Sequence, residues 1–198
     1  MSLARKATHG DLARICRTVT VSFAEEPIVR WLFPDDEEYF AGLVMRPFLR
    51  RLLAHDETYI TDDCVAVAAF VPPGRPEVEV DVEPETDLAP APPERVERYI
   101  ALGEAMHEHT PPEPHWYLNV LGTHPDWQRQ GLGALLMSML FATCDEQGSP
   151  MYLETGTPSN VAYYGHHGFI VRSEFDVGAG GPHLWGMIRH PQTEDRHS

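Results

Sequence analysis

The stretch GTHPDWQRQGLGALLMSML, residues 122–140, joins a turn rich in glutamine, arginine and glycine to a long apolar segment. Leucine and methionine recur after Gly131 at the three- and four-residue spacing of a helix, and the apolar residues before the turn are typical of a strand. Such a helix start presents free backbone N–H groups and the positive end of the helix dipole, while glycines let a ligand approach the main chain. Because Arg129 adds a positive charge, we predict that the turn binds a phosphate or pyrophosphate.

Two other phosphate-binding loops do not fit this stretch. A P-loop needs a lysine after its second glycine, and the stretch contains no lysine. A dinucleotide-binding loop needs a small residue three positions after its second glycine, where Leu136 stands. The pattern that remains, Gln-x-x-Gly-x-Gly from Gln128 to Gly133, resembles the acetyl-coenzyme A pyrophosphate loop of the Gcn5-related N-acetyltransferase (GNAT) family.

A second stretch, MYLETGTPSNVAYYGHHGF at residues 151–169, strengthens this resemblance. Asn160, Tyr164, Gly168 and Phe169 match the family pattern Asn-Val-x-x-Tyr-x-x-x-Gly-Phe position by position. The likeness is strong over residues 116–169 and looser before residue 71, and it extends to the branch of the family that acetylates puromycin.

The resemblance implies a mixed α/β fold, the GNAT acyl-CoA N-acyltransferase fold, with a central mixed sheet of six or seven strands flanked by helices. The fourth and fifth strands of such a sheet splay apart and admit the acyl-pantetheine arm. The residue pattern agrees, because helical and strand periodicities alternate along the chain without an internal repeat. We expect one domain over residues 1–191 and a disordered tail over residues 192–198.

The same periodicity predicts the individual elements. Helices are expected at residues 11–24, from about residue 35 with a kink at Pro47, and at residues 94–109, 131–147 and 159–167. Strands are expected at residues 3–8, 58–61, 64–71, 115–121, 151–155, 169–177 and 183–188. Pro27 is interpreted as the stop of the first helix. The acidic, proline-rich residues 72–93 predict a surface loop, with an edge strand as the alternative.

The resemblance also implies which residues hold acetyl-coenzyme A. Backbone groups of Leu121 and Thr123 would pair with the pantetheine arm, and Gly122, Asn160 and Tyr164 are also expected to contact the cofactor. The residues that would surround the pyrophosphate are Gln128, Arg129, Gln130, Gly131, Leu132, Gly133 and Ala134.

Acetyl transfer to an amine needs three groups from the protein. A backbone N–H, that of Leu121, would stabilise the negative charge that develops on the thioester oxygen. Tyr164, which matches the general-acid tyrosine of the family, would protonate the departing thiolate, although it could instead be a packing residue. Glu154 is the first candidate for the base that takes the proton of the amine, and a structural or substrate-charge role is its alternative.

Other residues could contact the acceptor amine. Acidic residues after the first predicted helix could attract a cation or could be solvated helix ends; they are Glu25, Glu26, Asp35 and Asp36. Large aromatic residues could line the acceptor pocket or belong to the core; they are Trp31, Trp116, Tyr117 and Trp185. Two histidine pairs, His107 with His109 and His166 with His167, lack the spacing of metal ligands, so no metal site is predicted.

The composition narrows the class of protein. The 198 residues include 30 acidic and 15 basic side chains, which give a formal net charge of −15 and no basic stripe for nucleic acid. The three cysteines form no CxxC pattern, and no stretch has the length of a signal peptide core or a membrane span. We expect a cytoplasmic monomer or homodimer with a small-molecule partner.

The predicted function is the transfer of an acetyl group from acetyl-coenzyme A to a primary amine of a small molecule. Two alternatives stay open, a catalytically silent acyl-coenzyme A-binding or sensing domain and a protein or peptide N-acetyltransferase. The identity of the amine and the preferred acyl chain do not follow from the sequence.

Overall fold

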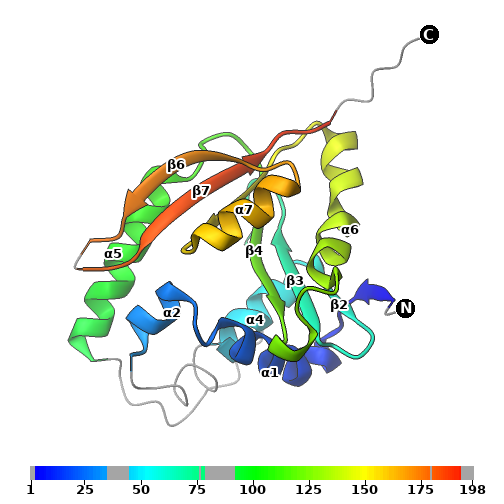
Figure 1. The fold of residues 1–198 in the computed structure, drawn as a ribbon, viewed down its shortest axis with the longest axis horizontal. Helices are drawn as coiled ribbons and strands as arrows, with labels where there is room; N and C mark the ends of the chain where they lie inside the picture. Colours follow the sequence, from blue (N-terminus) through cyan, green and yellow to red (C-terminus); the bar gives the residue numbers. More distant parts are fainter. Residues whose placement is uncertain (1–2, 35–44, 76, 79–91, 179, 193–198) are drawn as a thin grey trace.

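The computed structural model describes residues 3–34, 45–75, 77–78, 92–178 and 180–192. Within these residues the centre of the protein is a seven-stranded sheet in the order β1-β2-β3-β4-β5-β7-β6 (Figure 1). The strands are β1 (Ala4–Lys6), β2 (Thr58–Thr61), β3 (Ala66–Val71), β4 (Trp116–Thr123), β5 (Met151–Thr155), β6 (Ile170–Asp176) and β7 (His183–Arg189). Neighbouring strands are antiparallel except β4 and β5, so the sheet is mixed, as predicted.

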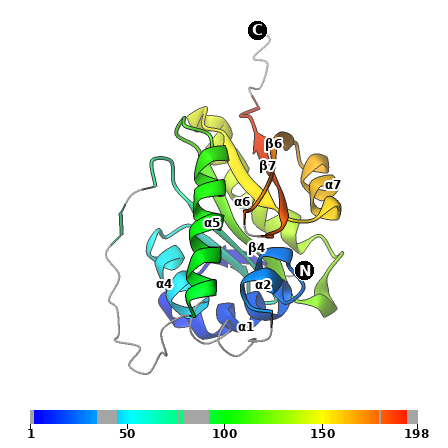
Figure 2. The same ribbon diagram turned by 90° about the vertical axis from the view of Figure 1, so that its left-hand side faces the viewer.

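Helices cover both faces of the sheet (Figures 1 and 2). One face carries α1 (Leu12–Phe23), α2 (Pro27–Leu32), α4 (Met45–Ala54) and α5 (Pro93–His109), whose apolar residues share a core with the strands. The other face carries α6 (Leu132–Gln147) and α7 (Pro158–His166), which pack into a second core. Two short 3-10 turns, η1 (His9–Asp11) and η3 (Pro125–Trp127), precede α1 and α6.

The boundaries of α6 follow from its glycines. Gly131 precedes the helix with φ at 80° and Gly148 follows it with φ at 62°, in the left-handed region that favours glycine. Between them Leu136, Met137 and Leu140 are buried against the sheet. The helix therefore starts where the quoted turn ends, which places its N-terminus beside the end of β4.

Strands β4 and β5 pair over only two positions. Trp116 lies opposite Met151 and Tyr117 lies opposite Tyr152, and the described pairing does not continue beyond them. The chain crosses between the two strands through α6, as a parallel connection requires. The remaining lengths of β4 and β5 therefore diverge and leave a gap at the centre of the sheet, as the family resemblance implied.

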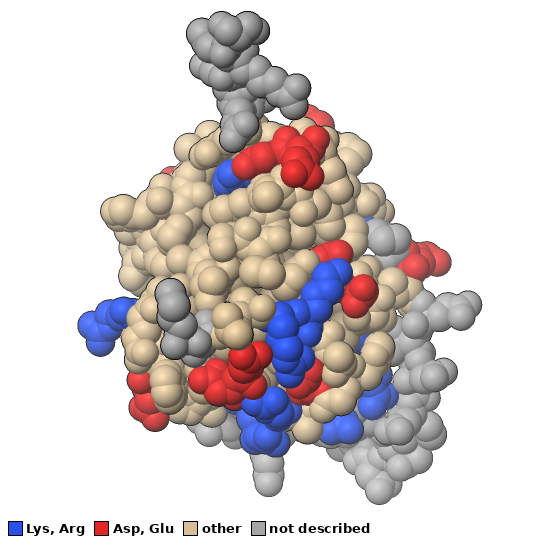
Figure 3. All heavy atoms as spheres, turned by 90° about the vertical axis from the view of Figure 1, so that its right-hand side faces the viewer, with Lys and Arg blue, Asp and Glu red and all other residues tan. Residues whose placement is uncertain are grey.

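The surface carries charges of both signs. On the face shown in Figure 3, basic side chains lie beside acidic ones. Near the N-terminus Arg5 pairs with Asp11 at 2.8 Å and Lys6 pairs with Glu57 at 3.1 Å. No helix in the described part of the chain is long and apolar enough to span a bilayer.

The predicted elements within the described residues are present, with differences at prolines. Pro27 follows the end of α1, but it also begins α2, a helix that the sequence reading did not expect, because proline is well suited to the first helical position. Pro47 lies within α4, and the earlier part of the helix predicted from about residue 35 lies outside the described residues, so the predicted kink stays a prediction. Residues 35–44, most of the predicted loop over residues 72–93, and residues 193–198 lie outside the described part.

Candidate active site

A cleft of about 450 Å³ lies at the gap in the sheet, between the end of β4 and the first turns of α6 and α7. Most of the residues predicted to bind a cofactor line it; they are Leu121, Thr123, Gln128, Arg129, Gly131, Leu132, Gly133, Asn160 and Tyr164. Trp127, Ser159 and Tyr163 also contribute to its wall, although the sequence did not single them out as ligand contacts. The structure thus brings together two motifs that are separated in the chain.

The turn before α6 is shaped by two left-handed residues. Arg129 has φ at 60° and Gly131 has φ at 80°. The first helical hydrogen bond runs from the Leu135 N–H to the Gly131 carbonyl at 2.9 Å. The N–H groups of the three residues between them therefore have no acceptor within the helix and are available to an anion.

Gly133 shows why the turn needs small residues. A Cβ atom at this position would lie 2.8 Å from the Tyr163 hydroxyl, so a side chain would compete with Tyr163 for the cleft. Gly122 is small for another reason, because a Cβ there would overlap Ser22 of α1. Gly122 therefore faces α1, away from the cleft in which the sequence had placed it.

Alternate backbone groups of β4 face the gap. The His124 N–H donates to the Val65 carbonyl at 2.8 Å, which fixes the register of hydrogen bonds between β4 and β3. Hydrogen-bonded residues alternate along an antiparallel pair, so the backbone groups of Leu121 and Thr123 point away from β3. The Gln128 amide donates to the Thr123 carbonyl at 3.3 Å, in keeping with that direction. These strand residues have the orientation that β-like pairing with a ligand requires.

Tyr164 and Tyr163 differ in their surroundings. Both stand on α7, whose start is capped by the Thr157 side chain accepting the Asn160 N–H. Tyr164 is buried and packs edge-to-face on Phe169, and burial raises its pKa above the ordinary value. Tyr163 is more exposed. The phenol of Tyr164 therefore stays protonated at neutral pH and is a hydrogen donor within the cleft.

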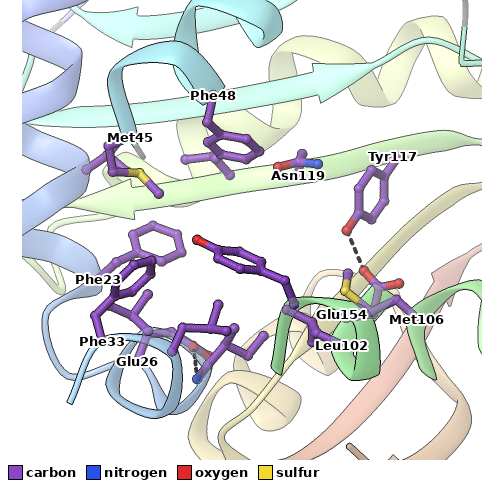
Figure 4. A pocket seen from close by; sticks show the side chains of 16 residues that line it. Phe23, Glu26, Phe33, Met45, Phe48, Leu102, Met106, Tyr117, Asn119 and Glu154 are labelled. Carbon is purple, nitrogen blue, oxygen red and sulfur yellow. Dashed lines mark hydrogen bonds between the residues drawn. The ribbon is translucent and has the colours of Figure 1, made fainter. Parts of the chain in front are cut away.

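A second cavity, of about 290 Å³, lies on the opposite face of β4, among α1, α2, α4 and α5 (Figure 4). Asn119 is an extra residue of β4, a bulge at which the register with β3 shifts. As a result Asn119 and the next residue, Val120, both line this cavity, whereas Leu121 lines the cleft. The cavity and the cleft are therefore built from the two sides of one strand.

Glu154 lines this cavity from β5, where the strands have separated. Its Oε2 accepts the Tyr117 hydroxyl at 2.6 Å (Figure 4). Burial raises its pKa to about 7, although the Tyr117 hydroxyl and the positive charge of Arg75 oppose the shift. The Tyr152 hydroxyl makes its hydrogen bond with the His109 carbonyl, and no group of the described chain donates to the buried Oε1 of Glu154. This buried oxygen therefore keeps an unused acceptor position beside the cavity.

Glu26 lines the cavity from the start of α2. Its Oε2 accepts the Ile28 N–H at 2.7 Å and so caps the helix. Burial raises its pKa above the ordinary value. A Cβ on Gly156 would lie 3.0 Å from its Oε1, and its charge contributes to the raised pKa of Tyr164. Glu26 is therefore close both to the end of β5 and to the tyrosine of the cleft.

Other predicted residues lie elsewhere. Glu25 is exposed and pairs with Arg30 at 2.7 Å. Trp31 packs against the β6–β7 hairpin and carries Arg98 over its ring. Trp116 is buried on the α6 side of the sheet, where its indole N–H donates to Gln147 at 3.1 Å. These placements favour a core role for the two tryptophans, and Tyr117 is the predicted aromatic residue that lines the cavity.

The remaining expectations concern metal and the acidic loop. Within the described residues no group of three histidine, cysteine or acidic side chains could hold a metal ion. Asp35 and Asp36 lie outside the described residues. The lining of the second cavity was missed from the sequence, apart from Glu26, Tyr117 and Glu154, because its apolar residues resemble ordinary core positions.

A mixed sheet that opens between two parallel strands over a glycine turn defines the class of the N-acetyltransferases. The chain matches the model of the acetyltransferase (GNAT) family over residues 21–169 and belongs to this family.

Individual relatives agree with this assignment. An uncharacterized N-acetyltransferase from Schizosaccharomyces pombe is 32% identical over 83 residues, which are 41% of this chain and 34% of the relative; the match thus spans about a third of that protein. The fold is similar to a solved histone acetyltransferase HPA2 and related acetyltransferase from Corynebacterium glutamicum, with a TM-score of 0.67, 18% identity and coverage of 98% and 99% of the two chains. It is also similar to arylalkylamine N-acetyltransferase 2 from Aedes aegypti, with a TM-score of 0.68, 11% identity and coverage of 96% and 99%.

Proposed function

We propose that this protein transfers the acetyl group of acetyl-coenzyme A to a primary amine of a small molecule by direct attack. One observation carries the proposal: the gap between β4 and β5 separates a cleft that contains a glycine turn and Tyr164 from a cavity that contains Glu154. Members of the family generally use acetyl-coenzyme A, and the residues of the cleft suit it. The free N–H groups at the start of α6 would hold the pyrophosphate, and Leu121 and Thr123 would pair with the pantetheine amides.

The amine would enter from the cavity as an ammonium ion. Glu154 would take one proton from it, either directly or through a water molecule, because a carboxyl with a pKa of about 7 is a usable base at neutral pH. The neutral nitrogen then forms a bond to the thioester carbon, and the bond from that carbon to sulfur breaks. The backbone N–H of Leu121 would stabilise the negative charge on the carbonyl oxygen, a contribution typically of about 10²–10³ in rate.

Tyr164 would complete the reaction on the other side of the gap. The bond cleavage leaves a thiolate, which takes the phenolic proton of Tyr164, and the tyrosinate recovers a proton from the acetylated product or from water. Burial keeps the phenol of Tyr164 protonated until the thiolate forms, although the raised pKa also makes it a weaker acid than an exposed tyrosine. Acetyl-coenzyme A supplies the activated acyl group and needs no other reactant.

The test of this function is a titration followed by an assay. Calorimetric titration with acetyl-coenzyme A should show micromolar binding, and a panel of small primary amines, puromycin included, should then release free thiol from it. Binding without release on any small amine but with release on basic peptides would make the protein a peptide acetyltransferase. Binding with no release at all would support the silent sensing domain, and absence of binding would refute the cleft assignment.

A further inference from the structure

The wall of the cavity is apolar over most of its extent. Of the 16 described residues that line it, Glu26, Asn119 and Glu154 are polar or charged, and the others are aliphatic, aromatic or methionine side chains (Figure 4). The aromatic members come from four elements and from the residue after α2, so that rings face the cavity from several directions; they are Phe23, Phe33, Phe48, Tyr99 and Tyr117. A surface of this kind binds a ring or an aliphatic body by excluding water.

The polar groups of the cavity differ in their hydrogen bonds. Glu26 is already engaged by the backbone of α2, and Asn119 carries no charge. Glu154 has one oxygen engaged by Tyr117 and one buried oxygen, Oε1, that no described group contacts through a hydrogen bond. The cavity therefore provides a buried position for one ammonium group, at Glu154, with apolar walls around it.

We infer that the acceptor is a primary amine with a single positive charge on a compact apolar body that carries a ring. This inference rests on the proposed function and names its substrate class. Away from Glu26, Asn119 and the tyrosine hydroxyls, a second ammonium or a set of hydroxyls would lie against apolar residues such as Phe33, Phe48 and Leu102, where it would lose its hydration without gaining a partner. A volume of about 290 Å³ is at the small end for ligand pockets, which suits one ring with a short chain.

The experiment compares kcat/KM for amines that share the reacting group. The value of kcat/KM for 2-phenylethylamine should be at least tenfold higher than that for ethylamine, which lacks the ring. It should also be at least tenfold higher than that for spermidine, which carries additional charges. Equal or higher values for spermidine or ethylamine would overturn the inference and leave the acetyltransferase function intact. Failure of every amine, with acetyl-coenzyme A still bound, would refute the proposed function and this inference with it.

A pair of variants on α5 locates the effect in the cavity. Leu102 lines the cavity, so Leu102→Trp should fill it and lower kcat/KM for 2-phenylethylamine at least tenfold, with a smaller loss for ethylamine. Ile100 lies on the same helix but is 55% exposed and outside the cavity, so Ile100→Trp should leave both values within about twofold. Coenzyme A affinity, measured by calorimetry, checks that each variant is folded. Equal losses of kcat/KM for both amines in a folded Leu102→Trp protein would contradict the assignment of this cavity as the binding site of the ring.

Discussion

At the scale of single residues, the environment of Glu154 determines the expected pH dependence. Its pKa of about 7 results from burial, and the base form is the one that accepts a proton. We therefore predict that kcat/KM rises with pH up to about 7 and then levels. Glu154→Gln should lose this rise and lower kcat/KM by about 10²-fold or more. Glu97→Gln, an exposed position on α5, is the control, and a normal pH rise in Glu154→Gln would exclude Glu154 as the base.

The same carboxyl predicts a change in stability. A carboxyl with a folded-state pKa raised to about 7 holds its proton in the folded protein while the unfolded chain, near the ordinary value of 4.5, loses it. Its contribution to stability is thus lost as pH rises from about 4.5 to about 7. Relative to the wild type, Glu154→Gln should gain about 2 kcal/mol in free energy of unfolding between about pH 5 and pH 8. Urea unfolding at the two pH values measures this, and a constant difference would mean that Glu154 titrates normally.

Tyr164 is tested by removal of its hydroxyl alone. Tyr164→Phe should keep the ring packed on Phe169 and lower kcat by about 10- to 100-fold, because the thiolate then lacks its acid. The Kd for acetyl-coenzyme A, from calorimetry, should change by less than about threefold. Tyr59→Phe is the matched control, since Tyr59 is buried in the same core and its hydroxyl donates to Glu57, away from the cleft. If Tyr164→Phe kept full kcat, Tyr164 would be a packing residue.

At the scale of elements, the start of α6 is the part most sensitive to added volume. A side chain on Gly133 would meet the Tyr163 hydroxyl, so Gly133→Val should raise the Kd for coenzyme A at least tenfold. Gly103→Val, at an exposed position of α5 where a Cβ meets nothing within 4 Å, should leave that Kd unchanged. Circular dichroism would verify that both variants keep their helices. Unaltered affinity in a folded Gly133→Val protein would move the pyrophosphate away from this turn.

Elements with regular periodicity were predictable from the sequence, and irregular ones were not. The apolar spacing of α6 between Gly131 and Gly148 gave its position within a residue at each end. Helix α2 was missed for two reasons. Its six residues are too few to show a periodic pattern, and a proline such as Pro27 can mark either the end of one helix or the start of another. The bulge at Asn119 was also missed, since a shift of register depends on the partner strand.

The residues of the candidate site also differ in whether the sequence could predict them. The position of Leu121 in the cleft could be predicted from a motif. Trp116 and Tyr117 could not be told apart by type, yet adjacent strand residues face opposite sides of a sheet, and only Tyr117 lines the cavity. The pairing of Tyr117 with Glu154 joins two strands that are separated by α6 in the chain, so it required the structure.

At the scale of the whole molecule, the formal net charge of −15 acts on both reactants. It would attract the proposed cationic amine and repel coenzyme A at long range, and both effects would be screened once the Debye length falls below about 10 Å. The proposed contact between the ammonium and Glu154 would be buried and screened much less. We predict that raising the salt concentration from about 0.02 M to about 0.5 M increases KM for the amine several-fold and leaves kcat unchanged.

A charge-reversal variant separates this long-range attraction from general effects of salt. Glu97→Lys combined with Glu104→Lys adds four positive units on the exposed side of α5, outside both the cavity and the cleft. KM for the amine at low salt should rise in this variant, and its dependence on salt should become weaker, because less attraction remains to be screened. The Kd for coenzyme A should move in the opposite direction at low salt, since the repulsion of an anion is reduced. If KM for the amine and the Kd for coenzyme A rose together, the substitutions would have disturbed the structure. An unchanged salt dependence of KM would show that capture of the amine depends on the buried carboxylates alone.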